Sequence, residues 1–229
     1  MGVTIFAVAL TLAAYLATRH LYLRFRHPLL NVVAWSAAII ICVLVACKIP
    51  YSAYVPAKDI MTALLGPATV GLAVPLYRHR GLLLRFAPAI LGSVVLGALL
   101  AMMTASLMAQ WGGLPRDVVM SILPKGVTIP FAVEIARIYG GIPALTAAFV
   151  VATGTLGSLC GGWLLTLARI DNPVARGLAL GTVSHGQGTA TALMEGELQG
   201  AMAGLAMILA GIFTAGFAPL AVWLLALLA

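Results

Sequence analysis

Three short segments combine helix-breaking residues with hydroxyl side chains inside otherwise apolar sequence. They are Gly66–Thr69, Pro124–Pro130 and Ser184–Thr189. Inside a bilayer, non-helical backbone is tolerated only where protein or a water-filled cavity can satisfy its free N–H and C=O groups. A helix that restarts after such a break presents unpaired N–H groups and a partial positive charge, which suit a carboxylate or a phosphate. A simple kink explains any single break well, but three breaks with polar residues favour a binding site.

Lys125, His185 and Glu134 are ionisable residues within or near these breaks. An ionisable group in a membrane segment costs about 2.5–3.5 kcal/mol on insertion scales, which makes Lys125 a functional candidate; the alternative is an interfacial lysine. His185 titrates in the range that suits proton coupling, although a hydrogen-bonded packing histidine is the simpler alternative. Glu134 either relays a proton or forms a local ion pair with Arg137, three residues further on.

The elements that must position these residues are hydrophobic helices. Hydrophobic residues make up 62% of the chain, charged residues 8%, and the mean hydropathy is +1.10, which excludes an ordinary soluble domain. The net charge of +7 lies at the ends of apolar runs, so it indicates topology control and not nucleic-acid binding. Cys42, Cys47 and Cys160 have no metal-ligand spacing, and we expect no disulfide, metal or cofactor. Gly157 and Gly161 have the spacing of close helix packing.

Uncharged intervals near or above the roughly 20 residues of a membrane-spanning helix predict an all-α polytopic bundle. We expect about seven transmembrane helices and one re-entrant or broken segment, in a single integral membrane domain over residues 1–229. The predicted segments are a helix to about Leu23, Val32–Cys47, Asp59–Tyr77, Leu82–Ala109, the interrupted Asp117–Tyr139, Pro143–Leu167, Val174–Met194 and Gly200–Leu228.

Basic residues are biased to the cytoplasmic side of short loops, and this bias predicts the topology. The loops around Arg24 and Arg80 both lie inside if the N-terminus lies outside. Arg176 also lies inside only if Asp117–Tyr139 dips into the membrane and returns; Glu195 and Glu197 then lie outside. The third and penultimate segments become interrupted counterparts in inverted halves, roughly 1–110 and 115–229, an arrangement that points to a transporter's binding site.

At these breaks the chain resembles the LrgB/CidB family of bacterial membrane proteins, which is related to the plastid glycolate/glycerate translocator. The matching stretches are GPATVGLAVPLYR at 66–78, LPKGVTIPFAVEIARIYGGIPALTA at 123–147, ARGLALGTVSHGQGTATALMEGELQGA at 175–201 and LAMILAGIFTA at 205–215. The chain departs from the family pattern at Gly126 and Ile129, where a hydroxyl is usual, and at Thr191, where a basic residue is usual. The absence of a basic residue at Thr191 changes the number of substrate charges that the break at Ser184–Thr189 could neutralise.

The resemblance implies a multi-pass protein of the bacterial cytoplasmic (inner) membrane, often with a small LrgA/CidA-type membrane partner, that moves small carboxylates such as pyruvate or glycolate. It also implies a link to murein hydrolase activity and lysis, with a holin/antiholin interpretation. Together with the breaks it predicts these substrate-binding residues: Pro67, Thr69, Pro124, Lys125, Thr128, Ser184, His185, Gly188 and Thr189. The predicted coupling residues are Glu134 and His185.

The first functional hypothesis is a proton- or cation-coupled secondary transporter of small monocarboxylates, which we expect to be a homo-oligomer. Lys125 and the helix N-termini at Thr69 and Thr189 hold the carboxylate. The second hypothesis is a holin-like regulator of murein hydrolases and lysis. A third, an intramembrane enzyme with Ser184 as nucleophile and His185 as base, is disfavoured because adjacent helical residues point about 100° apart and no GxSxG elbow is present. We therefore expect no enzyme activity.

Overall fold

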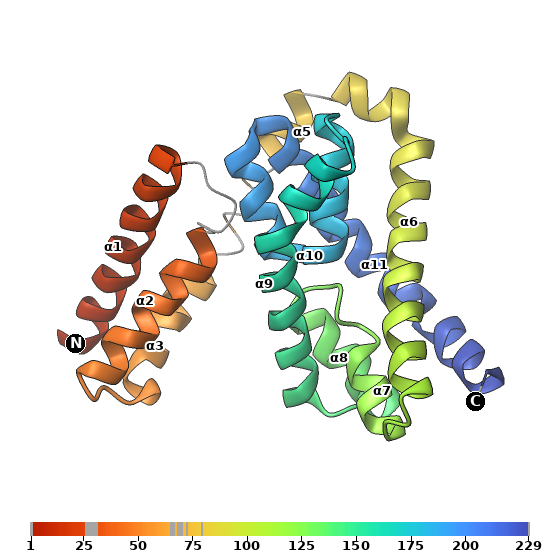
Figure 1. The fold of residues 1–229 in the computed structure, drawn as a ribbon, viewed down its shortest axis with the longest axis horizontal. Helices are drawn as coiled ribbons and strands as arrows, with labels where there is room; N and C mark the ends of the chain where they lie inside the picture. Colours follow the sequence, from red (N-terminus) through yellow and green to blue (C-terminus); the bar gives the residue numbers. More distant parts are fainter. Residues whose placement is uncertain are drawn as a thin grey trace. The chain divides into compact units, whose positions relative to one another are not determined.

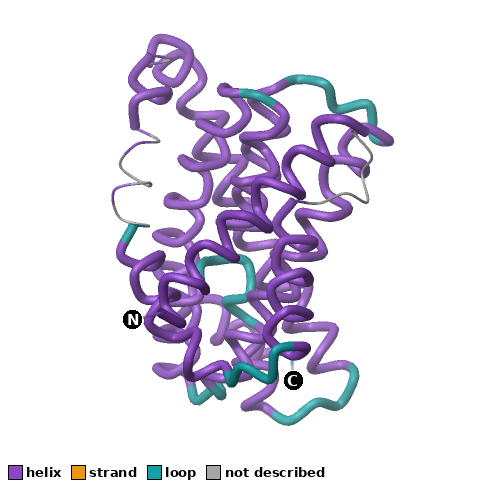
Figure 2. The backbone as a smooth tube through the Cα atoms, turned by 90° about the vertical axis from the view of Figure 1, so that its left-hand side faces the viewer, coloured by secondary structure: helices purple, strands orange, loops and turns teal. Residues whose placement is uncertain are grey.

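The computed structural model describes residues 2–25, 32–64, 67, 71, 73–78 and 80–228. Throughout these ranges the backbone is helix, turn or loop, with no strand (Figure 2). The helices are α1 (Gly2–Phe25), α2 (Val32–Ala46), α3 (Tyr51–Ala63), α5 (Ala73–Arg78), α6 (Arg80–Trp111), α7 (Arg116–Ile122), α8 (Ile129–Tyr139), α9 (Pro143–Leu167), α10 (Pro173–Glu195) and α11 (Glu197–Leu227). The all-α prediction is confirmed for the described residues.

Among the residues that the structure describes, four helices are long and apolar enough to cross a membrane: α1, Leu83–Trp111 of α6, α9 and α11. The apolar stretch Trp35–Ala46 in α2 is shorter. Helix α9 has the bounds predicted from the sequence, Pro143–Leu167, because Pro143 favours the first turn of a helix and the next charge is Arg169. The chain is a polytopic helical membrane protein.

The chain divides into two compact units, Met1–Val74 and Pro75–Ala229. In the first unit, α1 packs against α2 and α3 (Figure 1). The hydroxyls of Thr18 and Ser36 are 2.7 Å apart in a buried contact between α1 and α2, and those of Thr11 and Tyr54 are 2.9 Å apart between α1 and α3. Hydroxyl side chains therefore make hydrogen bonds between these apolar helices.

Helix α3 differs from the predicted segment Asp59–Tyr77, because it begins at Tyr51 and ends at Ala63. The prediction used the charges of Lys58 and Asp59 as a boundary, but these side chains form an exposed 2.9 Å ion pair on the helix and do not end it. Most of the predicted break Gly66–Thr69, including Thr69, lies outside the described residues. Pro67 is described as helical and exposed.

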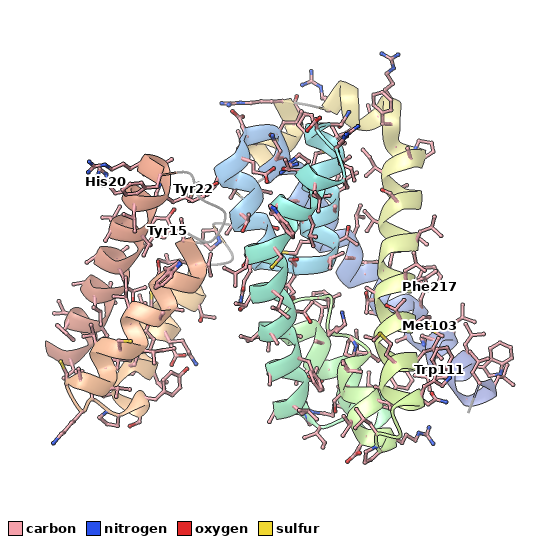
Figure 3. The ribbon with its side chains drawn as sticks, viewed as in Figure 1. Tyr15, His20, Tyr22, Met103, Trp111 and Phe217 are labelled. Carbon is pink, nitrogen blue, oxygen red and sulfur yellow. The ribbon has the colours of Figure 1, made fainter. Side chains whose placement is uncertain are left out.

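The second unit is built on the long helices α6, α9 and α11. A buried cluster joins α6, α7, α8 and α11 and includes Met102, Leu123 and Ile135. Met103 and Phe217 pack against this cluster (Figure 3). A second cluster joins α6, α10 and α11. The long helices thus share buried faces with the shorter elements between them.

The predicted interrupted segment Asp117–Tyr139 is broken in the structure, as α7 and α8 separated by a turn over residues 123–128. The Ile142 N–H donates to Ser121 Oγ at 2.7 Å. The residue that precedes α9 therefore lies against the last turn of α7. Helices α7 and α8 lie beside the C-terminal end of α6 and the N-terminal end of α9, at the bottom of Figure 1. We call this element hairpin 1 (residues 116–139).

Helix α10 also folds back on itself, whereas the sequence predicted that Val174–Met194 crosses as one segment. Arg176 Nε donates to Glu195 Oε2 at 2.7 Å and Arg176 Nη2 to Glu195 Oε1 at 2.8 Å, although 19 residues separate them. In a straight helix that separation is about 28 Å. The reversal occurs at His185, with φ 41° and ψ −129°. We call α10 hairpin 2, with a first arm (173–184) and a second arm (186–195).

The predicted position of Glu195 and Glu197 on the outside of the membrane is wrong. Glu195 binds Arg176, and Glu197 lies 3.2 Å from Arg78, so both carboxylates lie with basic residues predicted to be inside. The prediction placed them outside because it counted the penultimate segment as a crossing. Both ends of hairpin 2 lie near the C-terminal end of α9, whereas hairpin 1 lies near the N-terminal end of α9. The two hairpins therefore extend towards the middle of α9 from its opposite ends.

Candidate functional site

The tip of hairpin 1 is a turn that anchors two apolar side chains and leaves a lysine between them. Leu123 and Val127 are each only 1% exposed. Lys125 N–H donates to the Ile122 carbonyl at 3.1 Å, and Lys125 itself is half-buried. Thr128 occupies the N-cap position of α8, but its hydroxyl makes no capping hydrogen bond. The α8 N-terminus is therefore open to another acceptor.

The tip of hairpin 2 is held by hydrogen bonds around His185, which is buried. Its Nε2 lies 3.0 Å from the Val150 carbonyl of α9, and because a carbonyl can only accept, the ring proton is on Nε2. Thr189 Oγ1 donates to the His185 carbonyl at 2.9 Å. Thr189 therefore bonds to the tip's own backbone. The arrangement matches a hydrogen-bonded packing histidine, with Nδ1 as the remaining ring acceptor.

Glycines let the hairpins and α9 approach closely. A Cβ added at Gly154 would lie 2.5 Å from the His185 ring, and one added at Gly157 would overlap Ser184 Oγ. A Cβ at Gly188 would overlap the Leu180 carbonyl of the first arm. Gly157 does have the close-packing role that its spacing predicted. The tip of hairpin 2 consequently sits against the middle of α9.

The two tips meet at a cavity of about 550 Å³ that we call the tip cavity. Lys125 of hairpin 1 and Ser184 of hairpin 2 both line it, together with Thr153, Gly157 and Cys160 of α9. Gly126 approaches the Thr182 carbonyl, with 3.8 Å to an added Cβ. Lys125 makes no ion pair or side-chain hydrogen bond within the described part of the chain. The described lining of the cavity therefore includes one uncompensated cation and a serine hydroxyl, and both groups suit an anion.

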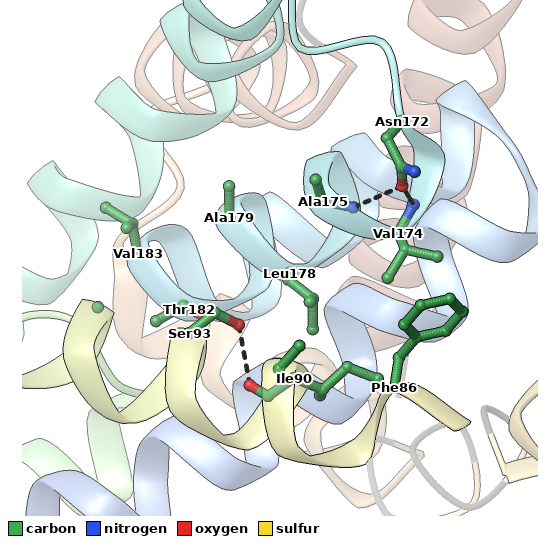
Figure 4. Close-up of a pocket in the computed structure, with 12 residues that line it drawn as sticks. Phe86, Ile90, Ser93, Asn172, Val174, Ala175, Leu178, Ala179, Thr182 and Val183 are labelled. Atoms are coloured by element: carbon green, nitrogen blue, oxygen red, sulfur yellow. Dashed lines mark hydrogen bonds between the residues drawn. The ribbon is translucent and has the colours of Figure 1, made fainter. Parts of the chain in front are cut away.

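A second cavity, of about 680 Å³, lies between α6 and the first arm of hairpin 2 (Figure 4). Its polar side chains are largely engaged: Ser93 Oγ donates to the Ile90 carbonyl, and Asn172 Oδ1 accepts from the N–H groups of Val174 and Ala175. Ala179 and Val183 line both cavities. The first arm of hairpin 2 thus separates this second cavity from the tip cavity.

The predicted site residues fall into distinct places. Pro124, Lys125, Ser184 and His185 come together at the two tips, with Thr128 starting α8 and Gly188 and Thr189 supporting hairpin 2. Glu134 does not join them: it forms a 3.0 Å ion pair with Arg137, and both side chains are 63% exposed. Thr153 and Cys160 line the tip cavity and Gly154 lies against the His185 ring, but none of these residues of α9 carries a sequence signal beyond small size in an apolar run.

Comparison with known proteins gives matches over nearly the whole chain. The LrgB-like family matches residues 11–224. The uncharacterized protein YxaC of Bacillus subtilis is 37% identical over 97% of this chain and 96% of its own length. The holin-like protein CidB of Staphylococcus aureus is 30% identical over 95% of each chain. No solved structure matches.

Proposed function

The chain belongs to the LrgB-like family, and we propose that it is a secondary transporter of small monocarboxylates across the bacterial cytoplasmic membrane. The substrates are pyruvate, glycolate or similar 2-oxo and 2-hydroxy acids. The observation that carries the proposal is the meeting of two helical hairpins around an unpaired lysine, Lys125, at the tip cavity. Interrupted helices whose ends point at a shared cavity are how many transporters bind ions and substrates near the midplane.

The hairpins also support an inverted arrangement within the membrane. Hairpin 1 followed by α9, and hairpin 2 followed by α11, are similar units that enter from opposite ends. With the N-terminus outside, Arg78, Arg176, Glu195 and Glu197 all lie inside, in agreement with the bias of basic residues. In this arrangement both hairpins are re-entrant and neither crosses.

Cysteine accessibility tests this topology. Single cysteines at positions 115 and 141, on either side of hairpin 1, should react with a membrane-impermeant maleimide from the outside of intact cells. Cysteines at 172 and 196, on either side of hairpin 2, should react only after the membrane is opened. Labelling of 172 and 196 from different faces would contradict the re-entrant hairpin 2.

In the proposed site, Lys125 neutralises the carboxylate and Ser184 donates a hydrogen bond to it. His185 is the better candidate for a coupling proton than Glu134, because His185 is buried at the tip while Glu134 is exposed and paired with Arg137. Alternating access would then move the hairpins against α6, α9 and α11.

Transport is tested with the purified chain in liposomes. Uptake of labelled pyruvate, glycolate and lactate should saturate and respond to a pH gradient, and Lys125→Gln should reduce it at least tenfold. Arg137→Gln is a matched control, since it also removes a cation from the same broken segment but lies outside the tip cavity. Equal uptake by the Lys125→Gln and wild-type proteins would refute the site.

A second candidate function is favoured by the relatives CidB of Staphylococcus aureus and Staphylococcus epidermidis, which are called holin-like proteins. In that case this chain modulates oligomeric pores and murein hydrolase activity, with a small LrgA/CidA-type partner. Liposomes containing a trapped fluorescent dye, prepared with and without such a partner, discriminate the two. Dye leakage that is not saturable and survives Lys125→Gln supports the holin-like function and contradicts the transporter.

A further inference from the structure

The tip cavity has a composition that restricts its ligand more narrowly than the presence of a lysine does. Lys125 is the only ionisable side chain, apart from the thiol of Cys160, among the described residues that line it. A second carboxylate in the cavity would be buried without a counter-charge, which is strongly unfavourable. The cavity is therefore suited to an acid with a single negative charge.

Aliphatic side chains make up much of the remaining lining, and we call four of them the aliphatic wall. They are Leu156 and Leu164 of α9 and Leu180 and Val183 of hairpin 2. Leu180 is buried at 2% exposure, while the other three residues are 42–63% exposed. These side chains offer no hydrogen bonds, so the part of a ligand that reaches them must itself be apolar for its contact to be favourable.

The volume of the cavity also favours a ligand with a chain longer than three carbons. A three-carbon acid occupies on the order of 100 Å³, a few times the roughly 30 Å³ share of one water molecule. The tip cavity measures about 550 Å³. A carboxylate held at Lys125 and Ser184 would leave most of the aliphatic wall uncovered if its chain ended at the third carbon.

Building on the proposed transport function, we propose that the tip cavity binds monocarboxylates with an aliphatic chain of about four to six carbons, such as the longer 2-oxo and 2-hydroxy acids, more tightly than the shorter substrates pyruvate and glycolate, and that it discriminates against dicarboxylates. Lys125 and Ser184 hold the carboxylate end. The aliphatic wall formed by Leu156, Leu164, Leu180 and Val183 receives the chain.

Cys160 provides a binding measurement that does not depend on transport, because it lines the same cavity. In a Cys42→Ala, Cys47→Ala background, the full chain in liposomes retains one thiol, and its rate of alkylation by a maleimide can be followed. Straight-chain 2-oxo acids from three to six carbons are added in turn as protectants. Each methylene should lower the half-protecting concentration about fourfold, since burying one methylene has that effect on affinity.

Two further comparisons test the charge and the wall. The dicarboxylate 2-oxoglutarate should protect at least tenfold more weakly than 2-oxopentanoate, which has the same chain length. Leu164→Trp fills the wall and should flatten the dependence on chain length. Leu167→Trp is the matched control, because Leu167 is an exposed leucine on the same helix that does not line the cavity, and it should leave the dependence unchanged.

The possible results separate this inference from the function on which it rests. Protection that does not improve with chain length, or equal protection by 2-oxoglutarate, overturns the proposed selectivity while carboxylate binding stands. Protection by no acid, together with absence of carboxylate uptake, overturns the transport function as well. Chain-length dependence that survives Leu164→Trp unchanged overturns the assignment of the wall.

Discussion

Substitution of Glu195 by glutamine tests the reversal of α10 on which the candidate site depends. The substitution removes both charged hydrogen bonds that join the ends of hairpin 2, at 2.7 and 2.8 Å. The two side chains are only 12% and 16% exposed. Removing one partner of a buried pair typically costs about 3–5 kcal/mol, because the other charge is left buried.

The expected cost lies at the lower edge of that range. Arg176 would retain hydrogen bonds to the carbonyls of Gly162 and Ile170, both at 3.0 Å, and to Thr166 Oγ1 at 3.2 Å. We therefore expect Glu195→Gln to lower the free energy of unfolding by about 3 kcal/mol. In a double-mutant cycle with Arg176→Gln, we expect a coupling free energy of about 2 kcal/mol.

The assay is reversible unfolding in mixed micelles of dodecyl maltoside and sodium dodecyl sulfate, followed by tryptophan fluorescence. The pair of Arg78 and Glu197 is the control: it has the same chemistry at the same end of the unit, but its side chains are 66% and 56% exposed. Its coupling should be about 0–1 kcal/mol. A coupling below about 0.5 kcal/mol between Arg176 and Glu195 would refute the fold-back, since a straight helix holds these residues about 28 Å apart.

Three further substitutions test the packing and the assignment of roles. Gly157→Ala should lower the free energy of unfolding by about 1–3 kcal/mol and reduce carboxylate uptake, because the new methyl group overlaps the hydroxyl of Ser184. Gly216→Ala is the control in the same unfolding assay, because nothing lies within 4 Å of a Cβ added at Gly216. Ser121→Ala should cost about 1–3 kcal/mol by leaving the N–H at the start of α9 without its acceptor, and hydrogen exchange at that amide should accelerate. Glu134→Gln should change stability by less than about 0.5 kcal/mol and leave the proton dependence of uptake intact; loss of that dependence would return Glu134 to the coupling role.

The sequence by itself determined the membrane class, the positions of the long helices and two of the breaks. The length of an apolar run and the charges at its ends are local properties, which is why Pro143–Leu167 was predicted with its observed bounds. The break around Lys125 was also visible, because proline and glycine interrupt a helix through their own backbone chemistry. These features need no knowledge of which segments are neighbours.

Only the tertiary structure decided that Val174–Met194 turns back at His185 and that its tip meets Lys125. A histidine with φ 41° has no local signal, and the ion pair that closes hairpin 2 joins residues 19 positions apart. The sequence also could not show that Glu134 lies away from the tip cavity, since helix rotation is set by packing against neighbours. Contacts distant along the chain select among conformations that local propensity leaves nearly equal in free energy, and those contacts exist only once the helices have packed.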